Sequence, residues 1–160
     1  MTERIAKEAI YKLQPALAQH LRALGEAPIK SGLEVSLIEL VKIRASQING
    51  CAFCVNMHSS DARKHGERQE RLDLVPVWRE APCFSARERA ALAWTEALTL
   101  IAETHAPDDV YEEVRQHFNE AELVNLTTLI GTINVWNRIA IGFRMQHPVA
   151  DSATRQQKSA

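Results

Sequence analysis

Cysteine is scarce in this sequence, neither charge is in excess, and uninterrupted apolar stretches are short. Three cysteines among 160 residues are too few for the disulfide framework of a small secreted domain. Nineteen basic and twenty acidic residues are interspersed and give a formal net charge of −1, so we expect no nucleic-acid-binding face. No stretch reaches the roughly 18 apolar residues of a membrane helix, so we expect a cytoplasmic protein that does not bind membranes.

The size and composition of the chain are those of a single folded domain. A chain of 160 residues fits one hydrophobic core, and its 46% hydrophobic and 24% charged residues match a globular protein. We therefore assign residues 1–148 to one domain. Residues 149–160 are polar with almost no apolar content, and we expect them to form a disordered tail.

Apolar residues recur at steps of three and four positions along nearly the whole chain, which predicts an all-α fold. Pro15 is expected to kink or divide the first helix, and Asn49-Gly50 to form the turn of a helical hairpin. Ser85 and Asn119 each stand three residues before a glutamate, which is the spacing of a helix cap. We expect six or seven helices, over residues 4–24, 34–48, 51–66, 69–75, 85–103, 107–117 and 119–144, with a loop over 28–32 and a connector over 78–84.

The last predicted helix is apolar on most of its sides, which indicates that more than one face is buried. A monomer of this length offers limited interior, so burial between subunits is the simplest explanation and we expect a homo-oligomer. Trp94, Trp136 and Phe143 stand at helical core spacing and are expected to pack within or between subunits. Residues 133–143 are also candidates for the wall of a substrate cavity.

Cys51 and Cys54 form a CxxC motif at the start of a predicted helix. In a reducing cytosol this spacing indicates either redox chemistry or metal binding. Because each helical residue advances by about 100°, Cys51, Cys54 and His58 lie along one stripe of the helix. Free backbone N–H groups and the positive end of the helix dipole favour thiolate over thiol at such a position. The motif therefore predicts a reactive cysteine pair.

Glu39 is the candidate partner of His58. The two residues lie on either side of the Asn49-Gly50 turn, and at about 1.5 Å per residue both lie roughly 12–15 Å along an antiparallel hairpin. We therefore expect them to be neighbours. A carboxylate bonded to one imidazole nitrogen would fix the tautomer and raise the basicity of the other nitrogen, which could then deprotonate Cys54 directly or through water.

The run from Glu39 to His58, E-x11-C-x2-C-x3-H, resembles the core of the AhpD-like alkylhydroperoxidases within the carboxymuconolactone decarboxylase superfamily. Segments 78–82, 88–96 and 133–138 extend the resemblance, which covers about residues 9–144. It implies an all-helical fold whose subunits assemble to dimers, trimers or hexamers. It also implies a thiol peroxidase reaction with a hydroperoxide substrate and an external thiol or dithiol reductant, without cofactor or metal.

The resemblance also implies a role for each residue of the motif. In the family the second cysteine becomes a sulfenic acid and the first resolves it to a disulfide, roles that fall here on Cys54 and Cys51. The glutamate and histidine of the family fall on Glu39 and His58. One position departs from the pattern, because the best-studied members have a second histidine where this chain has Phe53.

Two other interpretations stay open. Two thiolates and His58 would bind zinc if Cys83, His65 or Asp61 supplied a fourth ligand, although no second CxxC or HxxxH accompanies them. Alternatively, the same disulfide would serve a redox-sensing or binding protein without significant turnover. Decarboxylation is disfavoured, because that branch of the superfamily works without the dithiol. Otherwise we expect Cys83 to be a buried small hydrophobic residue without a chemical role.

Overall fold

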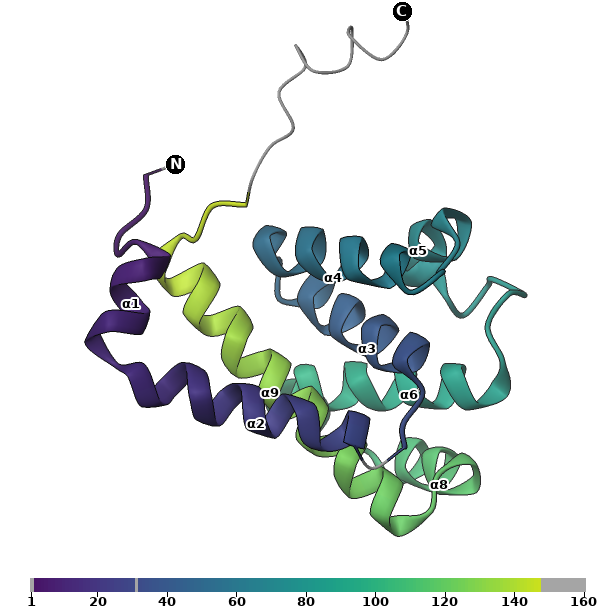
Figure 1. Ribbon diagram of the computed structural model, residues 1–160. Helices are drawn as coiled ribbons and strands as arrows, with labels where there is room; N and C mark the ends of the chain where they lie inside the picture. The colour runs from purple at the N-terminus through teal and green to yellow at the C-terminus, as the bar shows by residue number, and fades with distance from the viewer. Residues whose placement is uncertain (1, 31, 148–160) are drawn as a thin grey trace, which may run out of the picture.

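The computed structural model describes residues 2–30 and 32–147, and all regular structure within them is helical, which confirms the all-α class (Figure 1). The tail expected at 149–160 lies outside the described residues. The elements are α1 (Lys7–Leu13), α2 (Pro15–Lys30), α3 (Val35–Ile48), α4 (Ala52–Lys64), α5 (Gln69–Leu74), a 3-10 turn η1 (Val75–Val77), α6 (Ala86–Thr99), α7 (Ile101–Thr104), α8 (Asp108–His117) and α9 (Glu120–Phe143).

The described part of the chain has nine α-helices, where the periodicity predicted six or seven. The difference comes from two interruptions. Pro15 divides the first predicted helix into α1 and α2, as its ring and missing N–H require. A break at Leu100 separates the short α7 from α6.

The loop expected over residues 28–32 is shorter than predicted, because α2 continues through Pro28 to Lys30. A proline this close to the end of a helix removes only one hydrogen bond of the helical ladder. The Pro28 side chain is buried, and its carbonyl accepts a hydrogen bond of 3.2 Å from the Leu33 N–H. The end of α2 at Lys30 was not predicted from the sequence pattern, and the Pro28 ring is buried there.

Helix α3 lies at the centre of the domain and packs against α4, α6 and α9, while α2 runs along α9 (Figure 1). Eight of its fourteen residues are buried, which explains why the sequence there is apolar on several sides. Most of them are apolar and belong to the hydrophobic core, to which α3 contributes Leu37, Ile38, Leu40, Val41, Ile43 and Ala45. Helices α3 and α4 form the predicted hairpin, so the core helix and the CxxC helix have a fixed relative position.

Helix caps and one charged cluster stabilise the starts of α6 and α9 and the packing of α6. Ser85 and Asn119 form the predicted capping boxes of α6 and α9, each with the glutamate three residues later. Glu96 on α6 accepts hydrogen bonds from Arg44 of α3 (2.7 Å) and from the indole of Trp78 (2.8 Å). The same carboxylate therefore connects α3, the connector after η1 and α6.

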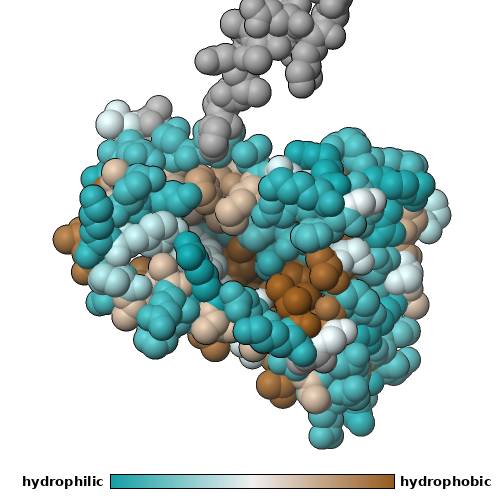
Figure 2. Space-filling model, viewed as in Figure 1, coloured by the Kyte–Doolittle hydropathy of each residue, from teal (hydrophilic) through white to brown (hydrophobic). Residues whose placement is uncertain are grey.

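None of the helices in residues 2–30 and 32–147 combines the length and the apolar character needed to cross a membrane. On the face seen in Figure 2 the surface is mostly hydrophilic, with apolar residues visible in its centre.

Candidate active site

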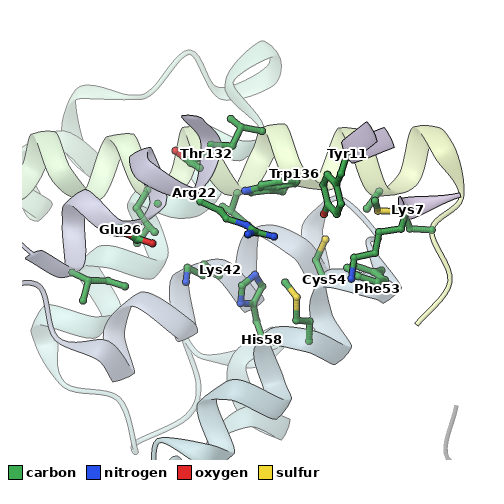
Figure 3. Close-up of a pocket in the computed structure, with 18 residues that line it drawn as sticks. Lys7, Tyr11, Arg22, Glu26, Lys42, Phe53, Cys54, His58, Thr132 and Trp136 are labelled. Carbon is green, nitrogen blue, oxygen red and sulfur yellow. The ribbon is translucent and has the colours of Figure 1, made fainter. Parts of the chain in front are cut away.

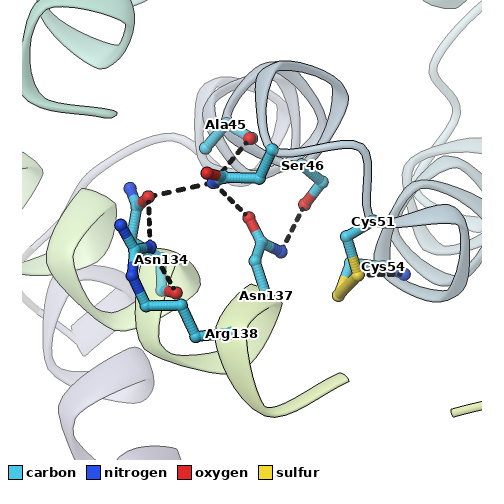
Figure 4. The surroundings of a disulfide bond; sticks show 8 residues. Ala45, Ser46, Cys51, Cys54, Asn134, Asn137 and Arg138 are labelled. Atoms are coloured by element: carbon cyan, nitrogen blue, oxygen red, sulfur yellow. Dashed lines mark hydrogen bonds between the residues drawn. A yellow bond between two sulfur atoms is a disulfide. The ribbon is translucent and has the colours of Figure 1, made fainter. Parts of the chain in front are cut away.

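The two motif cysteines are joined as a disulfide at the start of α4 (Figure 4). Cys51 is the N-cap residue, and its sulfur accepts a hydrogen bond of 3.3 Å from the Cys54 N–H. The two Cα atoms are 5.4 Å apart, and neither side chain is more than 2% exposed. Gly50 precedes them with φ of 71°, a left-handed conformation that glycine adopts without strain. The turn therefore places both sulfurs at the positive end of α4.

Glu39 and His58 are in contact, as the hairpin geometry predicts. His58 Nδ1 lies 2.9 Å from Glu39 Oε2, and both side chains are buried. Because a carboxylate only accepts hydrogen bonds, we assign the hydrogen to Nδ1, which leaves Nε2 of the neutral ring as the basic nitrogen. The contact is thus suited to fixing the tautomer of His58.

Lys42 completes this group, and sequence reasoning missed it. Its Nζ lies 2.9 Å from Glu39 Oε1, so the two oxygens of one carboxylate contact two different cationic or protonatable groups. Burial raises the pKa of Glu39, but the hydrogen bond from His58 and the charge of Lys42 outweigh it, so the pKa lies below its usual value. Glu39 is therefore ionised at neutral pH. The spacing of Lys42, three residues after Glu39 on a helix, could have indicated the pair.

A cavity of about 330 Å³ opens beside this group, between α1, α2, α3, α4 and α9. Figure 3 shows the Cys54 sulfur and the His58 ring directed toward the same space. Among the described residues, Cys54 lines this cavity and Cys51 does not. Trp136 and Ile133 contribute to the wall, in agreement with the prediction that α9 forms part of it. The remaining aromatic and charged lining residues are Lys7, Tyr11, Arg22, Glu26, Lys42 and Phe53.

Cys51 borders a second hollow of about 720 Å³, together with Gln47, Asn56 and Arg63. Its remaining walls come from the end of α3, the turn after it, α4, α5, η1 and His147. Gln47 Oε1 in this hollow is buried and has no hydrogen-bond partner among the described residues. The two cysteines of the disulfide therefore border different hollows.

A buried polar network holds the turn before Cys51 against α9 (Figure 4). Asn49 Nδ2 lies 2.9 Å from both Asn134 Oδ1 and Asn137 Oδ1, and Asn137 Nδ2 donates to Ser46 Oγ at 3.0 Å. Asn137 and Ser46 are fully buried. Sequence reasoning placed Asn49 in the turn and segment 133–138 in the family resemblance, but it did not predict this network, although two asparagines three positions apart in an apolar helix are an unusual feature.

The alternative zinc ligands do not gather around the cysteine pair. Cys83 is half-buried and packs beside Leu72 and Trp78, in a cluster separate from the one containing the disulfide. Asp61 forms an ion pair of 2.7 Å with Lys64 at the exposed end of α4. Within the described ranges no three side chains of the His, Cys, Asp or Glu type are placed to hold a metal ion together.

Comparison with known proteins identifies the family. The model of the carboxymuconolactone decarboxylase family matches residues 15–97, a segment that contains Glu39, both cysteines and His58. The chain belongs to the carboxymuconolactone decarboxylase family. Within this family it is 40% identical over 141 residues to the uncharacterized protein YdfG of Bacillus subtilis (strain 168), with 88% of this chain and 94% of YdfG covered.

Solved structures place the chain among the AhpD-like members of the family. It is 48% identical to protein ATU0492 of Agrobacterium tumefaciens, described as of unknown function and as a candidate antioxidant defence protein AhpD. The TM-score is 0.87, with 93% of this chain and 100% of that chain covered. The debrominase Bmp8 has the same fold at 18% identity and a TM-score of 0.75, with coverages of 91% and 78%. One fold thus serves proteins with different names, and activity has to be argued from the site.

Proposed function

We propose that this protein is a thiol-dependent peroxidase that reduces a hydroperoxide with Cys54 and restores itself through the Cys51–Cys54 disulfide. One observation supports this most directly: Cys54 lines a cavity together with His58, whose ring is fixed by Glu39. A nucleophile, a base and a group that orients the base are the three parts of an activated-nucleophile site. The AhpD-like fold and the CxxC pair support an antioxidant role in general.

The first half-reaction oxidises Cys54. In the reduced protein, His58 Nε2 takes the proton of the Cys54 thiol, directly or through a water molecule. The thiolate attacks the terminal oxygen of R–O–O–H, so a sulfur–oxygen bond forms while the oxygen–oxygen bond breaks. The released alkoxide takes the proton back from His58 and leaves as R–OH. Sulfur loses two electrons and becomes sulfenic acid, and the peroxide gains them.

The second half-reaction closes the disulfide. The Cys51 sulfur attacks the sulfenic sulfur, a sulfur–sulfur bond forms, and the hydroxyl group leaves with the Cys51 proton as water. The helix start brings the two cysteines together, since Cys51 is the cap of α4 and its Cα lies 5.4 Å from that of Cys54. The structure corresponds to this oxidised state.

We propose that the external dithiol reductant attacks Cys51, since that residue borders the second hollow. Attack there forms a mixed disulfide and releases the Cys54 thiolate beside His58. The second thiol of the reductant then displaces Cys51, leaving the reductant oxidised and both cysteines reduced. In this scheme the peroxide and the reductant use different sides of the disulfide.

Phe53 limits which side chains can transfer protons in this site, because a phenyl ring neither donates nor accepts a proton. It stands where the best-studied relatives have a second histidine, and its ring lines the cavity beside Cys54. Among the described lining residues His58 is the one imidazole. We therefore propose that His58 makes both proton transfers of the first half-reaction.

The deciding experiment is peroxide consumption in the presence of a dithiol that is continuously regenerated. We expect turnover by the wild-type protein, none by Cys54→Ser, and a single sulfenic acid on Cys54 in the Cys51→Ser variant. Cys83→Ser is the matched control and should turn over normally. If the disulfide forms but peroxide consumption does not exceed that of the dithiol alone, the protein is instead a redox sensor or binding protein using the same switch.

We also propose that the protein is a homo-oligomer, a dimer, trimer or hexamer. Val124 and Val135 are 65% and 40% exposed and lie three turns apart on one face of α9. Gly131 lies between them on the same face, with open space where a side chain would begin. A helix of a second copy could approach closely there. Light scattering of the wild type and of Val135→Arg tests this, with a smaller particle expected for the variant.

A further inference from the structure

The cavity beside Cys54 has positive charge that the protein itself does not neutralise. Lys7, Arg22 and Lys42 line it, and Glu26 is the one carboxylate among the described lining residues. Glu26 is paired with Lys30 at 3.0 Å, and Lys42 with Glu39 at 2.9 Å.

Lys7 and Arg22 have no such partner. Within residues 2–30 and 32–147 neither forms an ion pair, and their recorded contacts are with the faces of aromatic rings. Lys7 Nζ lies 5.5 Å from the Phe53 ring and the Arg22 guanidinium 6.0 Å from the Tyr11 ring. Both rings are part of the cavity wall, so both cations lie against residues that line the cavity.

The cavity is larger and more apolar than hydrogen peroxide requires. A volume of about 330 Å³ holds roughly ten water molecules or more, whereas hydrogen peroxide has two oxygen atoms. Leu129, Ile133 and Trp136 of α9 contribute apolar surface to the wall of this space. An apolar body with a polar end would use the space, whereas a small polar peroxide would leave it filled with water.

We propose that the substrates are organic hydroperoxides that carry a carboxylate, an inference that rests on the proposed peroxidase function. The apolar body of such a molecule occupies the cavity, and its hydroperoxide group lies at Cys54 and His58. Arg22 and Lys7 pair with the carboxylate at the edge, Arg22 through two parallel hydrogen bonds. The reaction is the one given above, and the product is the corresponding hydroxy acid.

A second role for the same cations is distinguishable from this one. Positive charge near Cys54 also stabilises its thiolate, which would accelerate the reduction of every hydroperoxide by the same factor. Pairing with a carboxylate accelerates only the anionic substrate. The ratio of two rates therefore separates substrate recognition from thiolate stabilisation.

The experiment uses two probes with the same skeleton, para-carboxy cumene hydroperoxide and its methyl ester. We expect kcat/KM of the wild type to be about two- to fivefold higher for the acid, the upper part of the range that exposed ion pairs provide. Arg22→Gln and Lys7→Gln should each lower this ratio toward one, with a larger loss of rate for the acid than for the ester. Arg22→Lys should keep most of the preference. Because both cations are near solvent, high salt should also reduce the ratio.

Lys12→Gln is the matched control, since Lys12 is an exposed cation of the same helix as Lys7 and does not line the cavity. It should leave the ratio unchanged. Equal rates for acid and ester in the wild type, or equal slowing of both by Arg22→Gln, would overturn the carboxylate proposal while the peroxidase function stands. If neither probe nor any other hydroperoxide is reduced, the proposed function fails and this inference fails with it.

Discussion

Glu39 of α3 and His58 of α4 meet at 2.9 Å on facing sides of a helical hairpin, although 19 positions separate them in the sequence. The contact lies beside the cavity that Cys54 lines, and the Glu39 carboxylate is held ionised by His58 and Lys42. A buried carboxylate bound to one ring nitrogen raises the basicity of the other. The two residues are therefore expected to behave as one unit in the chemistry of Cys54.

Substitution of either residue should slow peroxide reduction without unfolding the protein. General-base assistance contributes about 10²–10⁴-fold, so we expect losses in that range for His58→Ala and smaller losses for Glu39→Gln. The double variant should lose less than the product of the two single losses, because an unoriented base has less activity to lose.

The measurement for this prediction is the pH dependence of Cys54 alkylation in the reduced protein, with circular dichroism to confirm folding. The single variants should require higher pH for the same alkylation rate. Identical profiles in the wild type and in all three variants would assign thiolate formation to the helix N-terminus alone.

The order of the two cysteines is a separate prediction. Cys54 lines the cavity and Cys51 does not, so peroxide should meet Cys54 first. A sulfenic-acid probe should label Cys51→Ser at position 54 and leave Cys54→Ser unlabelled. Mild oxidation of the wild type should remove two hydrogens from the peptide that spans residues 51–54. Labelling of Cys54→Ser at Cys51 alone would reverse the order.

The sequence predicted how the four motif residues lie relative to one another wherever local rules decide the geometry. The helical repeat and one short turn determine how Glu39 faces His58, and the cap position of Cys51 determines how it meets Cys54. Helix starts at Ser85 and Asn119 were predicted for the same reason, since a capping box involves only neighbouring residues.

The cavity and its charges could not be predicted in this way. Arg22 reaches it because α2 packs along α9, more than 100 residues later in the chain, and periodicity does not specify which helices pair. The continuation of α2 through Pro28, whose side chain is buried, was likewise not indicated by the local pattern. The hydrogen bonds of Asn137 could not be predicted either, because its partners lie on α3 and in the turn that follows α3.

Asn137 is expected to be important for stability because its side chain is fully buried and both its amide oxygen and its amide nitrogen form hydrogen bonds. Asn137→Ala removes the partner of Ser46 and one partner of Asn49, and should lower the free energy of unfolding by about 1–3 kcal/mol. Urea denaturation measures this. Asn125→Ala is the control, since Asn125 is half-exposed on the same helix and donates only to the backbone of its own helix, so its effect should be within about 0.5 kcal/mol.

Glu96 should make the fold sensitive to acid. Burial raises its pKa, but hydrogen bonds from Trp78, Arg79 and Arg44 outweigh this and hold the pKa below its usual value. A carboxyl whose pKa is lower in the folded state than in the unfolded state stabilises the fold above the unfolded-state pKa. That contribution is lost as the pH falls through the folded-state value. The free energy of unfolding should therefore decrease as the pH falls below about 4 to 5.

Glu96→Gln tests this assignment. The variant removes the ionised partner of Arg44, so it should be less stable than the wild type at pH 7. The difference between the two proteins should shrink as the pH falls, because the wild type loses the same ion pairs by protonation. Glu112→Gln is the control, because its ion pair with Arg115 is exposed and contributes little. A difference between Glu96→Gln and the wild type that stays constant from pH 7 to pH 3 would show that Glu96 acts by packing and not by its charge.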